Sequence, residues 1–162
     1  MRFSTRLLLC SVIPAGLFVA ALTVSLWGLF RTQHEFDSYL STEQATANGL
    51  NEMYAQGLQM GQALRNIVLD PQNRKAYENF ASASEAYAKA QRDTAAMAGG
   101  TVLASSLEQL ATLREVQSAK QARVIALVKT DPAAAAQALT SDETPAWRNV
   151  RARLLEEIAK GR

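Results

Sequence analysis

The sequence contains very few of the residues that make covalent cross-links, metal sites or catalytic centres. Cys10 is the one cysteine and His34 the one histidine among 162 residues, so no disulfide can form within the chain. His34 has only Glu35 and Asp37 close by in sequence, which is a weak set of metal ligands. A glycine-rich phosphate loop and a paired-cysteine motif are both absent. We therefore expect no enzymatic activity, no cofactor and no metal site.

Helix breakers and an excess of charge of one sign are also scarce. The chain has 4 prolines and 8 glycines, and 17 basic residues stand against 15 acidic residues. An abundance of Ala, Leu, Gln and Glu with so few helix breakers favours helix throughout and predicts an all-α fold. No basic patch with interleaved aromatic residues occurs, so nucleic acid is not expected as a partner.

One long segment of the chain carries no charge. Residues 7–30 (LLLCSVIPAGLFVAALTVSLWGLF) are bracketed by Arg6 and Arg31. As a helix this segment spans about 36 Å, enough to cross a hydrocarbon core of about 30 Å. A cleaved signal peptide is the alternative, but the apolar run is too long and offers no cleavage site of small residues. We predict a retained transmembrane helix, in which Cys10 is a small apolar residue and not a lipidation site.

The distribution of basic residues predicts the orientation of this span. Arg2 and Arg6 precede it, whereas the residues that follow are mostly acidic or uncharged as far as Arg65. The positive-inside rule then places residues 1–6 in the cytoplasm and exports residues 31–162. Since the exported part contains no cysteine, it must be stable as one domain without disulfides.

A heptad repeat predicts the first exported helix, at about residues 32–69. Its seam consists of Phe36, Leu40, Glu43, Ala47, Leu50, Tyr54, Gly57, Gly61, Leu64 and Val68. A second stripe, Met53, Met60 and Ile67, recurs every seven residues beside it, so this helix is expected to face more than one neighbour. Gly57 and Gly61 are four residues apart, and we hypothesise that two copies of the chain pack closely along them.

The second helix is predicted at about residues 74–98. Pro71 disfavours helix immediately before it, and Asn73 is the expected N-cap. Gly99 and Gly100 end the helix as a C-cap and turn. Its apolar seam is Ala76, Phe80, Ala83, Tyr87, Ala90, Thr94 and Met97.

The third helix is predicted at about residues 101–129, with Thr101 as its N-cap. Its apolar residues are Leu103, Leu107, Leu110, Leu113, Val116, Val124, Ile125, Leu127 and Val128. The seam weakens between Gln117 and Arg123, where we expect a more hydrated layer.

The fourth helix is predicted at about residues 144–160. Before it, Asp131 and Pro132 are expected to start a short helical turn, and residues 140–144 a polar break. Four helices joined by short turns predict an antiparallel up-down four-helix bundle. At 1.5 Å per residue the fourth helix is about half as long as the first. This shortened fourth helix predicts a chain truncated before a second membrane span.

The membrane span that runs into a long helix, the stretch MGQALRNIVLDP at residues 60–71 and the later TPAW at residues 144–147 together resemble a known family. They resemble the periplasmic four-helix-bundle sensor domains of bacterial methyl-accepting chemotaxis proteins. The resemblance implies an inner-membrane protein with a periplasmic bundle, a homodimer and a small-molecule ligand bound near the membrane-distal end. It also implies that displacement of the last helix carries the signal across the membrane.

The resemblance also suggests ligand-binding residues. Arg65 lies near the distal end of the first helix, and arginine binds carboxylates with bidentate hydrogen bonds. Thr144 and Arg148, at the start of the last helix, are expected at the same end. This sequence departs from the amino-acid receptors of the family, because Arg65 is the only arginine between Arg31 and Arg74. A solvated or ion-paired Arg65 without a ligand role is the alternative.

Two other functions fit the same pattern of residues. One is a single-pass, membrane-anchored helical protein that binds a periplasmic partner, and the other is the input domain of a sensor histidine kinase. The residues leave open the ligand, the sign of the response, the type of output and whether the chain is a fragment.

Overall fold

The computed structural model describes the backbone of residues 3–160 and the side chains of residues 16, 18–33 and 40–160. Within these residues all regular structure is helical, which confirms the predicted all-α class. The elements are α1 (Phe3–Leu69), α2 (Arg74–Met97), α3 (Val102–Leu127), α4 (Pro132–Ala138), the π-helix η1 (Leu139–Glu143) and α5 (Thr144–Lys160). The chain divides into a first unit, Met1–Thr42, and a second unit, Glu43–Arg162, and α1 contributes to both.

The first unit exposes large apolar side chains in its described part. Phe18, Trp27 and Phe30 are 64–69 % exposed, and Val19, Leu22, Val24, Leu26 and Leu29 are also exposed. Arg31 lies over the ring of Trp27, with 5.9 Å between its guanidinium carbon and the ring centroid. Where side chains are described, no helix combines the length and the apolarity that crossing a bilayer requires. Residues 7–15 and Leu17 of the predicted span lie outside that part of the chain.

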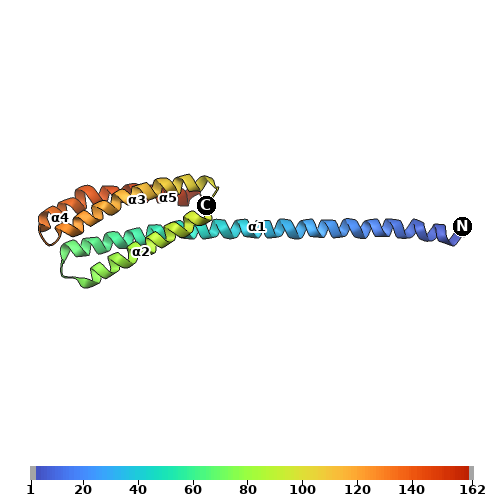
Figure 1. Ribbon diagram of the computed structural model, residues 1–162, viewed down its shortest axis with the longest axis horizontal. Coiled ribbons are helices and arrows are strands. Elements are labelled where there is room, and N and C mark those ends of the chain that lie inside the picture. The colour runs from blue at the N-terminus through green and yellow to red at the C-terminus, as the bar shows by residue number, and fades with distance from the viewer. Residues whose placement is uncertain (1–2, 161–162) are drawn as a thin grey trace. The chain divides into compact units, whose positions relative to one another are not determined.

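The second unit consists of helices that lie alongside one another. In Figure 1 the chain reverses direction after α1, after α2 and again between α3 and α4. The Asn73 side chain accepts a hydrogen bond from the backbone N–H of Ala76 at 3.1 Å, as predicted for the N-cap of α2. Asp131 caps α4 in the same way through the N–H of Ala134 at 3.0 Å, with Pro132 at the first helical position. The sequence therefore places these helix starts through its own capping residues.

Thr101 and Gly100 shape the connection between α2 and α3. Thr101 occupies the predicted N-cap position, but its hydroxyl donates to the carbonyl of Ala98 at 2.6 Å instead of capping α3. Gly100 has a φ of 79°, a left-handed conformation that favours glycine. The predicted turn is confirmed, and its side-chain cap is not.

Side chains from every helical segment of the second unit form the core. One cluster contains Leu50, Met53, Met60, Ala83, Tyr87, Ala90, Ala98, Leu107, Leu110, Trp147, Val150 and Leu154. The other contains Leu64, Ile67, Ala76, Val124, Val128, Ala135, Ala138 and Leu139. The stripe of Met53, Met60 and Ile67 is fully buried, so the part of α1 in this unit does face more than one neighbour, as predicted.

The last helical arm, which consists of α4, η1 and α5, differs from the prediction. No polar break separates α4 from α5, because the 7 residues of α4, the 5 of η1 and the 17 of α5 follow one another without a gap. α5 itself has the bounds predicted for the fourth helix, 144–160, and with 17 residues it is shorter than α1, so only the polar break before it is wrong. Pro145 explains the π-turn, since proline lacks an N–H and its ring would clash with the carbonyl four residues earlier. The wider turn lets the helix continue past this proline.

The hypothesis of a close dimer contact through Gly57 and Gly61 is wrong for Gly57. A side chain at Gly57 would collide with the ring of Trp147 in the same chain, so this glycine serves packing within the second unit. Gly61 is different, because a Cβ there would meet no atom within 4 Å.

These surroundings predict opposite effects of alanine at the two glycines. Gly57→Ala is expected to lower the free energy of unfolding by about 1–3 kcal/mol, because the Trp147 ring must move. Gly61→Ala, the matched control on the same helix, is expected to raise it by up to about 1 kcal/mol through helix propensity. Urea unfolding of the two variants, followed by circular dichroism, checks both values. Equal effects would contradict the packing described for Gly57.

Candidate functional site

A layer of polar side chains crosses the core of the second unit halfway along α3. Arg114, Gln117 and Gln121 lie on one face of α3 at steps of three and four residues, and each is at least 91 % buried. The sequence predicts a more hydrated layer near Gln117, and the polar character is confirmed. Its side chains are nevertheless buried and bond to one another.

Glu143 of η1 completes this layer. Its Oε1 accepts hydrogen bonds from the side-chain amides of Gln117 at 2.9 Å and Gln121 at 3.0 Å. The oxygens of the same two amides accept from Nη1 of Arg114, at 3.3 and 2.9 Å. Two glutamines therefore bridge a buried cation and a buried carboxylate. We call Arg114, Gln117, Gln121 and Glu143 the polar layer.

The π-turn determines where Glu143 points. Leu139 accepts hydrogen bonds from the backbone N–H of Thr144 and from its hydroxyl, the latter at 2.8 Å. The widened turn leaves Glu143 3 % exposed and facing α3, whereas its neighbour Asp142 pairs with Arg123 at the surface at 3.3 Å. Through Glu143 the last helical arm is joined to the middle of α3.

Burial and neighbouring charges act in opposite directions on Arg114. Burial lowers the pKa of its guanidinium, whereas Tyr87 and Glu143 raise it. Arg114 also lies over the ring of Tyr87, with 5.1 Å between the guanidinium carbon and the centroid. Its Nη2 donates to Sδ of Met60 at 3.2 Å, a weak acceptor. Arg114 thus has strong contacts through one nitrogen and weak ones through another.

Tyr87 of α2 lies against this layer, and its hydroxyl has no hydrogen-bond partner among the residues that the structure describes. The side chain is 1 % exposed. Burial raises the pKa of Tyr87 to about 12, an effect that the charge of Arg114 partly offsets. The hydroxyl therefore remains a protonated donor at neutral pH.

The raised pKa predicts that Tyr87 weakens the fold in alkali. The folded state holds this proton more tightly than the unfolded state, so its stabilising effect is complete below about pH 10 and is lost as the pH rises towards 12. The full loss is about 3 kcal/mol for a shift of two units. Tyr87→Phe removes this dependence. Urea unfolding at pH 9 and pH 11.5 measures the free energy of unfolding of the unmodified protein and of Tyr87→Phe. The difference between the two proteins should change by about 2 kcal/mol between these pH values. A difference that is the same at both pH values contradicts the burial of this hydroxyl.

A pocket of about 320 Å³ opens between α2 and α3 beside Tyr87 and Arg114. Residues at equivalent steps on the two helices line it: Ser84, Tyr87, Ala88 and Gln91 from α2, and Ala111, Arg114, Glu115 and Ser118 from α3. The alanines keep the space open, and the serines and Gln91 supply polar groups. The pocket and the polar layer share Arg114, and together they form the candidate ligand site.

The residues proposed from the sequence occupy other places. Arg65 and Arg148 are exposed. Thr144 is half-buried, and its hydroxyl donates to the carbonyl of Leu139 in the same arm. Among the described side chains, no hydrogen bond or ion pair joins any two of these three. The role of this set in ligand binding stays a prediction. Arg114 and Glu143 are not among the residues predicted from the sequence.

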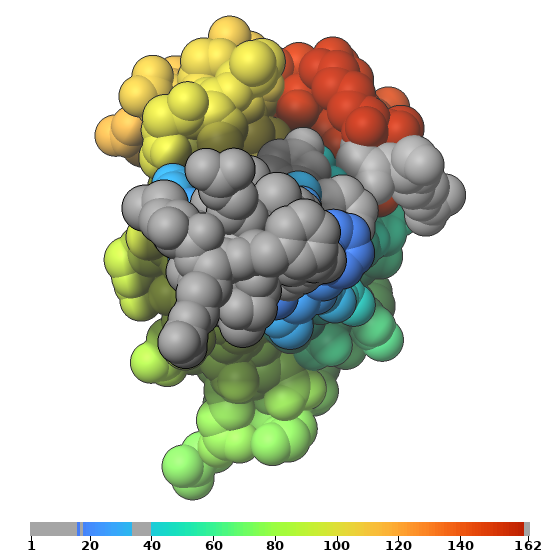
Figure 2. Space-filling model, turned by 90° about the vertical axis from the view of Figure 1, so that its right-hand side faces the viewer, coloured from blue at the N-terminus to red at the C-terminus, as the bar shows by residue number. Residues whose placement is uncertain are grey.

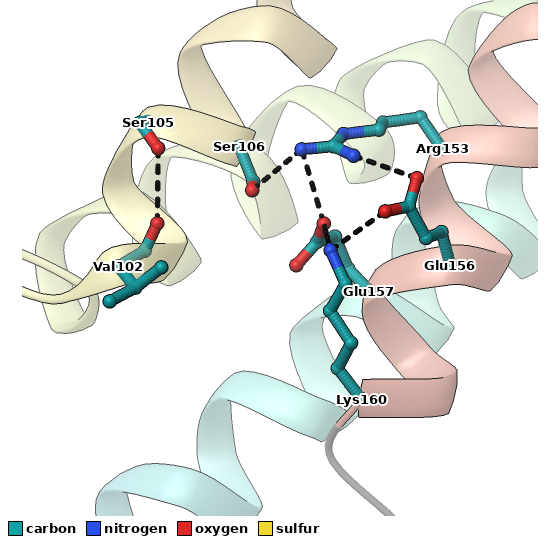
Figure 3. A network of polar contacts seen from close by, with 7 residues as sticks. All are labelled: Val102, Ser105, Ser106, Arg153, Glu156, Glu157 and Lys160. Atoms are coloured by element: carbon teal, nitrogen blue, oxygen red, sulfur yellow. Dashed lines mark hydrogen bonds and ion pairs between the residues drawn. The ribbon is translucent and has the colours of Figure 1, made fainter.

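A second polar network fastens the end of α5 to the start of α3 (Figure 3). Nη2 of Arg153 donates to Oγ of Ser106 at 2.8 Å, and Arg153 pairs with Glu156 at 2.7 Å and with buried Glu157 at 3.2 Å. Lys160 pairs with both glutamates at 2.8 Å. Figure 2 shows the same neighbourhood from the end of the unit, with α5 in red beside the yellow start of α3. The last arm is therefore held to α3 at this end and, through the polar layer, at its middle.

Comparisons with protein-family models, with curated proteins and with solved structures find no match for this chain. The described residues also contain no group of three or more His, Cys, Asp and Glu side chains placed to hold a metal ion. A functional assignment therefore depends on the site itself.

Proposed function

We propose that the chain is the ligand-sensing input domain of a bacterial chemotaxis transducer. In this proposal residues 7–30 anchor it in the inner membrane, with the N-terminus in the cytoplasm. The second unit is then a periplasmic, antiparallel up-down four-helix bundle that works as a homodimer. Ligand binding displaces the last helical arm, and that displacement is the signal.

The apolar surface of the first unit supports the membrane anchor. Eight large hydrophobic side chains between Phe18 and Phe30 are exposed along one helix, and Arg31 with Trp27 marks the end of the uncharged segment. A surface of this size and composition is unfavourable in water and favourable in a bilayer. Aromatic residues at the end of such a segment are typical of a membrane interface.

One observation carries the sensing function: a cation in the wall of a pocket is connected to the last helical arm by buried hydrogen bonds. Arg114 lines the pocket, Gln117 and Gln121 bond to it, and both bond to Glu143 of η1. A ligand that accepts a hydrogen bond from Arg114 must change the hydrogen bonds that connect Arg114 to Glu143. Because the polar layer is buried, a group in it that loses its partner is costly to leave unpaired, so a change at Arg114 favours a rearrangement of the whole layer.

The π-turn suits a movable element. It replaces regular α-helical hydrogen bonds with wider ones over residues 139–143, and such turns recur at functional sites. Helix shifts of about 1–2 Å are common in signalling transitions. A change of partner at Glu143 therefore has a direct route to α5, which ends in the network of Arg153.

A chimera tests this proposal. The full chain is joined to the second membrane span and the cytoplasmic half of a chemoreceptor whose kinase control is established, and kinase activity is measured in membranes. Against a panel of small neutral, anionic and cationic metabolites, at least one compound is expected to change kinase activity at least twofold. The control is the same receptor with its own sensor domain. A chimera that is silent throughout the panel while the control responds would contradict the sensing function.

A further inference from the structure

We propose that the pocket between α2 and α3 binds a small carboxylate, which accepts hydrogen bonds from the hydroxyl of Tyr87 and the guanidinium of Arg114. This inference names the ligand class for the site described above and rests on the proposed sensing function for its biological meaning. The binding step itself does not depend on that function and can be measured alone.

The first observation is the unpartnered hydroxyl of Tyr87. It belongs to a side chain that is 1 % exposed and lines the pocket, and no group in the described part of the chain accepts its proton. Buried polar groups nearly always have a partner, because leaving one unpaired is costly. An acceptor supplied by a ligand removes that cost.

The second observation is the unused hydrogen-bonding capacity of Arg114. Its guanidinium carries five donors, yet its described partners are two neutral amide oxygens and the sulfur of Met60. The balancing carboxylate, Glu143, reaches it only through the two glutamines. A carboxylate ligand forms a shorter and stronger charge-assisted bond than a thioether can.

Arg114 and Tyr87 are direct neighbours, with the guanidinium carbon of Arg114 5.1 Å from the centre of the Tyr87 ring. A carboxylate has two oxygens and can accept from both groups at once. The volume of about 320 Å³ and the alanines of the wall limit the ligand to a small molecule. Ser84, Gln91 and Ser118 offer further polar contacts.

Glu115 makes one feature of the ligand testable. It is exposed and lines the same pocket as Arg114. A ligand with an ammonium group beside its carboxylate gains attraction from Glu115, whereas a simple carboxylate does not. Comparing the two kinds of ligand therefore distinguishes a zwitterion site from a plain carboxylate site.

Binding must also disturb the polar layer. The Tyr87 hydroxyl is sealed from solvent in this structure, so a ligand reaches it only when side chains around the pocket rearrange. The same rearrangement acts on Arg114 and through it on the bonds to Glu143. Entry of the ligand and movement of the last arm are thereby coupled.

Calorimetry on the full chain in a mild detergent tests the ligand class. Sodium propionate and alanine are the probes, and propionamide is the uncharged control. Saturable binding of propionate or alanine is expected, with little or none for propionamide. Alanine that binds more tightly than propionate identifies the zwitterion, and equal affinity identifies the plain carboxylate. No binding by either, or equal binding of propionamide, would overturn the proposal.

Two matched variants test the residues. Tyr87→Phe removes only the unpartnered hydroxyl and is expected to fold, and the loss of a hydrogen bond to a charged group should weaken binding about tenfold. Tyr77→Phe is the control, because Tyr77 is on the same helix, does not line the pocket and bonds weakly to the carbonyl of Pro71 at 3.4 Å. Unchanged affinity in Tyr87→Phe would overturn the assignment. Binding without a response in the chimera contradicts the sensing function alone, whereas a chimera that responds only to other compounds contradicts the carboxylate assignment alone.

Discussion

Replacing Arg114 with methionine is expected to lower the free energy of unfolding by about 3–5 kcal/mol. The variant leaves Glu143 buried without a compensating cation. The side-chain oxygens of Gln117 and Gln121 also lose the Arg114 donor that orients the two amides. The shape of the side chain is largely kept, so the effect reports charge and hydrogen bonding. Urea unfolding of the full chain, followed by circular dichroism, measures the change.

The double variant Arg114→Met with Glu143→Leu provides the control. It removes both charges from the core, and it is expected to recover the part of the lost stability that comes from the uncompensated charge, while the buried amides of Gln117 and Gln121 remain without these partners. The two changes are then strongly non-additive, as expected for groups in one network. A cost below about 1 kcal/mol for Arg114→Met, or additive effects, would contradict a buried charge pair bridged by Gln117 and Gln121.

Trp147→Ala is the second change with a large expected effect, about 3–5 kcal/mol of lost stability. Trp147 is 7 % exposed and packs against Gly57 of α1, so truncation leaves a cavity where α1 and α5 meet. The chain holds a matched control in its other tryptophan, Trp27, which is 66 % exposed in the first unit. Trp27→Ala is expected to change unfolding of the second unit by less than about 0.5 kcal/mol. Similar costs for the two variants would contradict the described core.

Most of the fold follows from local signals in the sequence. Asn73, Pro71 and Pro132 define helix starts through backbone chemistry that depends little on the rest of the structure. The apolar stripes of α1 indicate its buried faces for the same reason. The continuous last arm was not predictable in this way, because Pro145 ordinarily starts a helix, and here the π-turn lets the helix pass through it.

The candidate site was harder to predict because its residues are polar and buried. In α3 the heptad steps from Leu107 and Leu110 continue through Arg114, Gln117 and Gln121 to Val124. The signal in the sequence was that polar residues occupy consecutive core positions of this heptad pattern. The prediction instead placed Val116 in the seam, and that residue is 50 % exposed. Glu143 gave no local signal, since its burial depends on the π-turn and on packing against α3.

The distal residues proposed from the family resemblance illustrate a different limit. The prediction of Arg65 and Arg148 rests on their chemistry and on their expected place along the helices. Which face of a helix an exposed arginine occupies depends on packing, and both arginines face solvent. The guanidinium that lies beside a pocket belongs to Arg114, which the sequence places in the middle of a helix.

In the proposed mechanism, ligand binding at the α2–α3 pocket moves the last helical arm. Fluorine NMR of the full chain labelled with 5-fluorotryptophan tests it directly, because Trp147 reports on α5 and Trp27 serves as an internal control. We predict that propionate or alanine shifts the Trp147 resonance along a saturation curve that matches calorimetry, while the Trp27 resonance stays in place. Tyr87→Phe should displace that curve to about tenfold higher concentration. A Trp147 resonance that does not move at saturating concentrations of the bound probe would contradict the account.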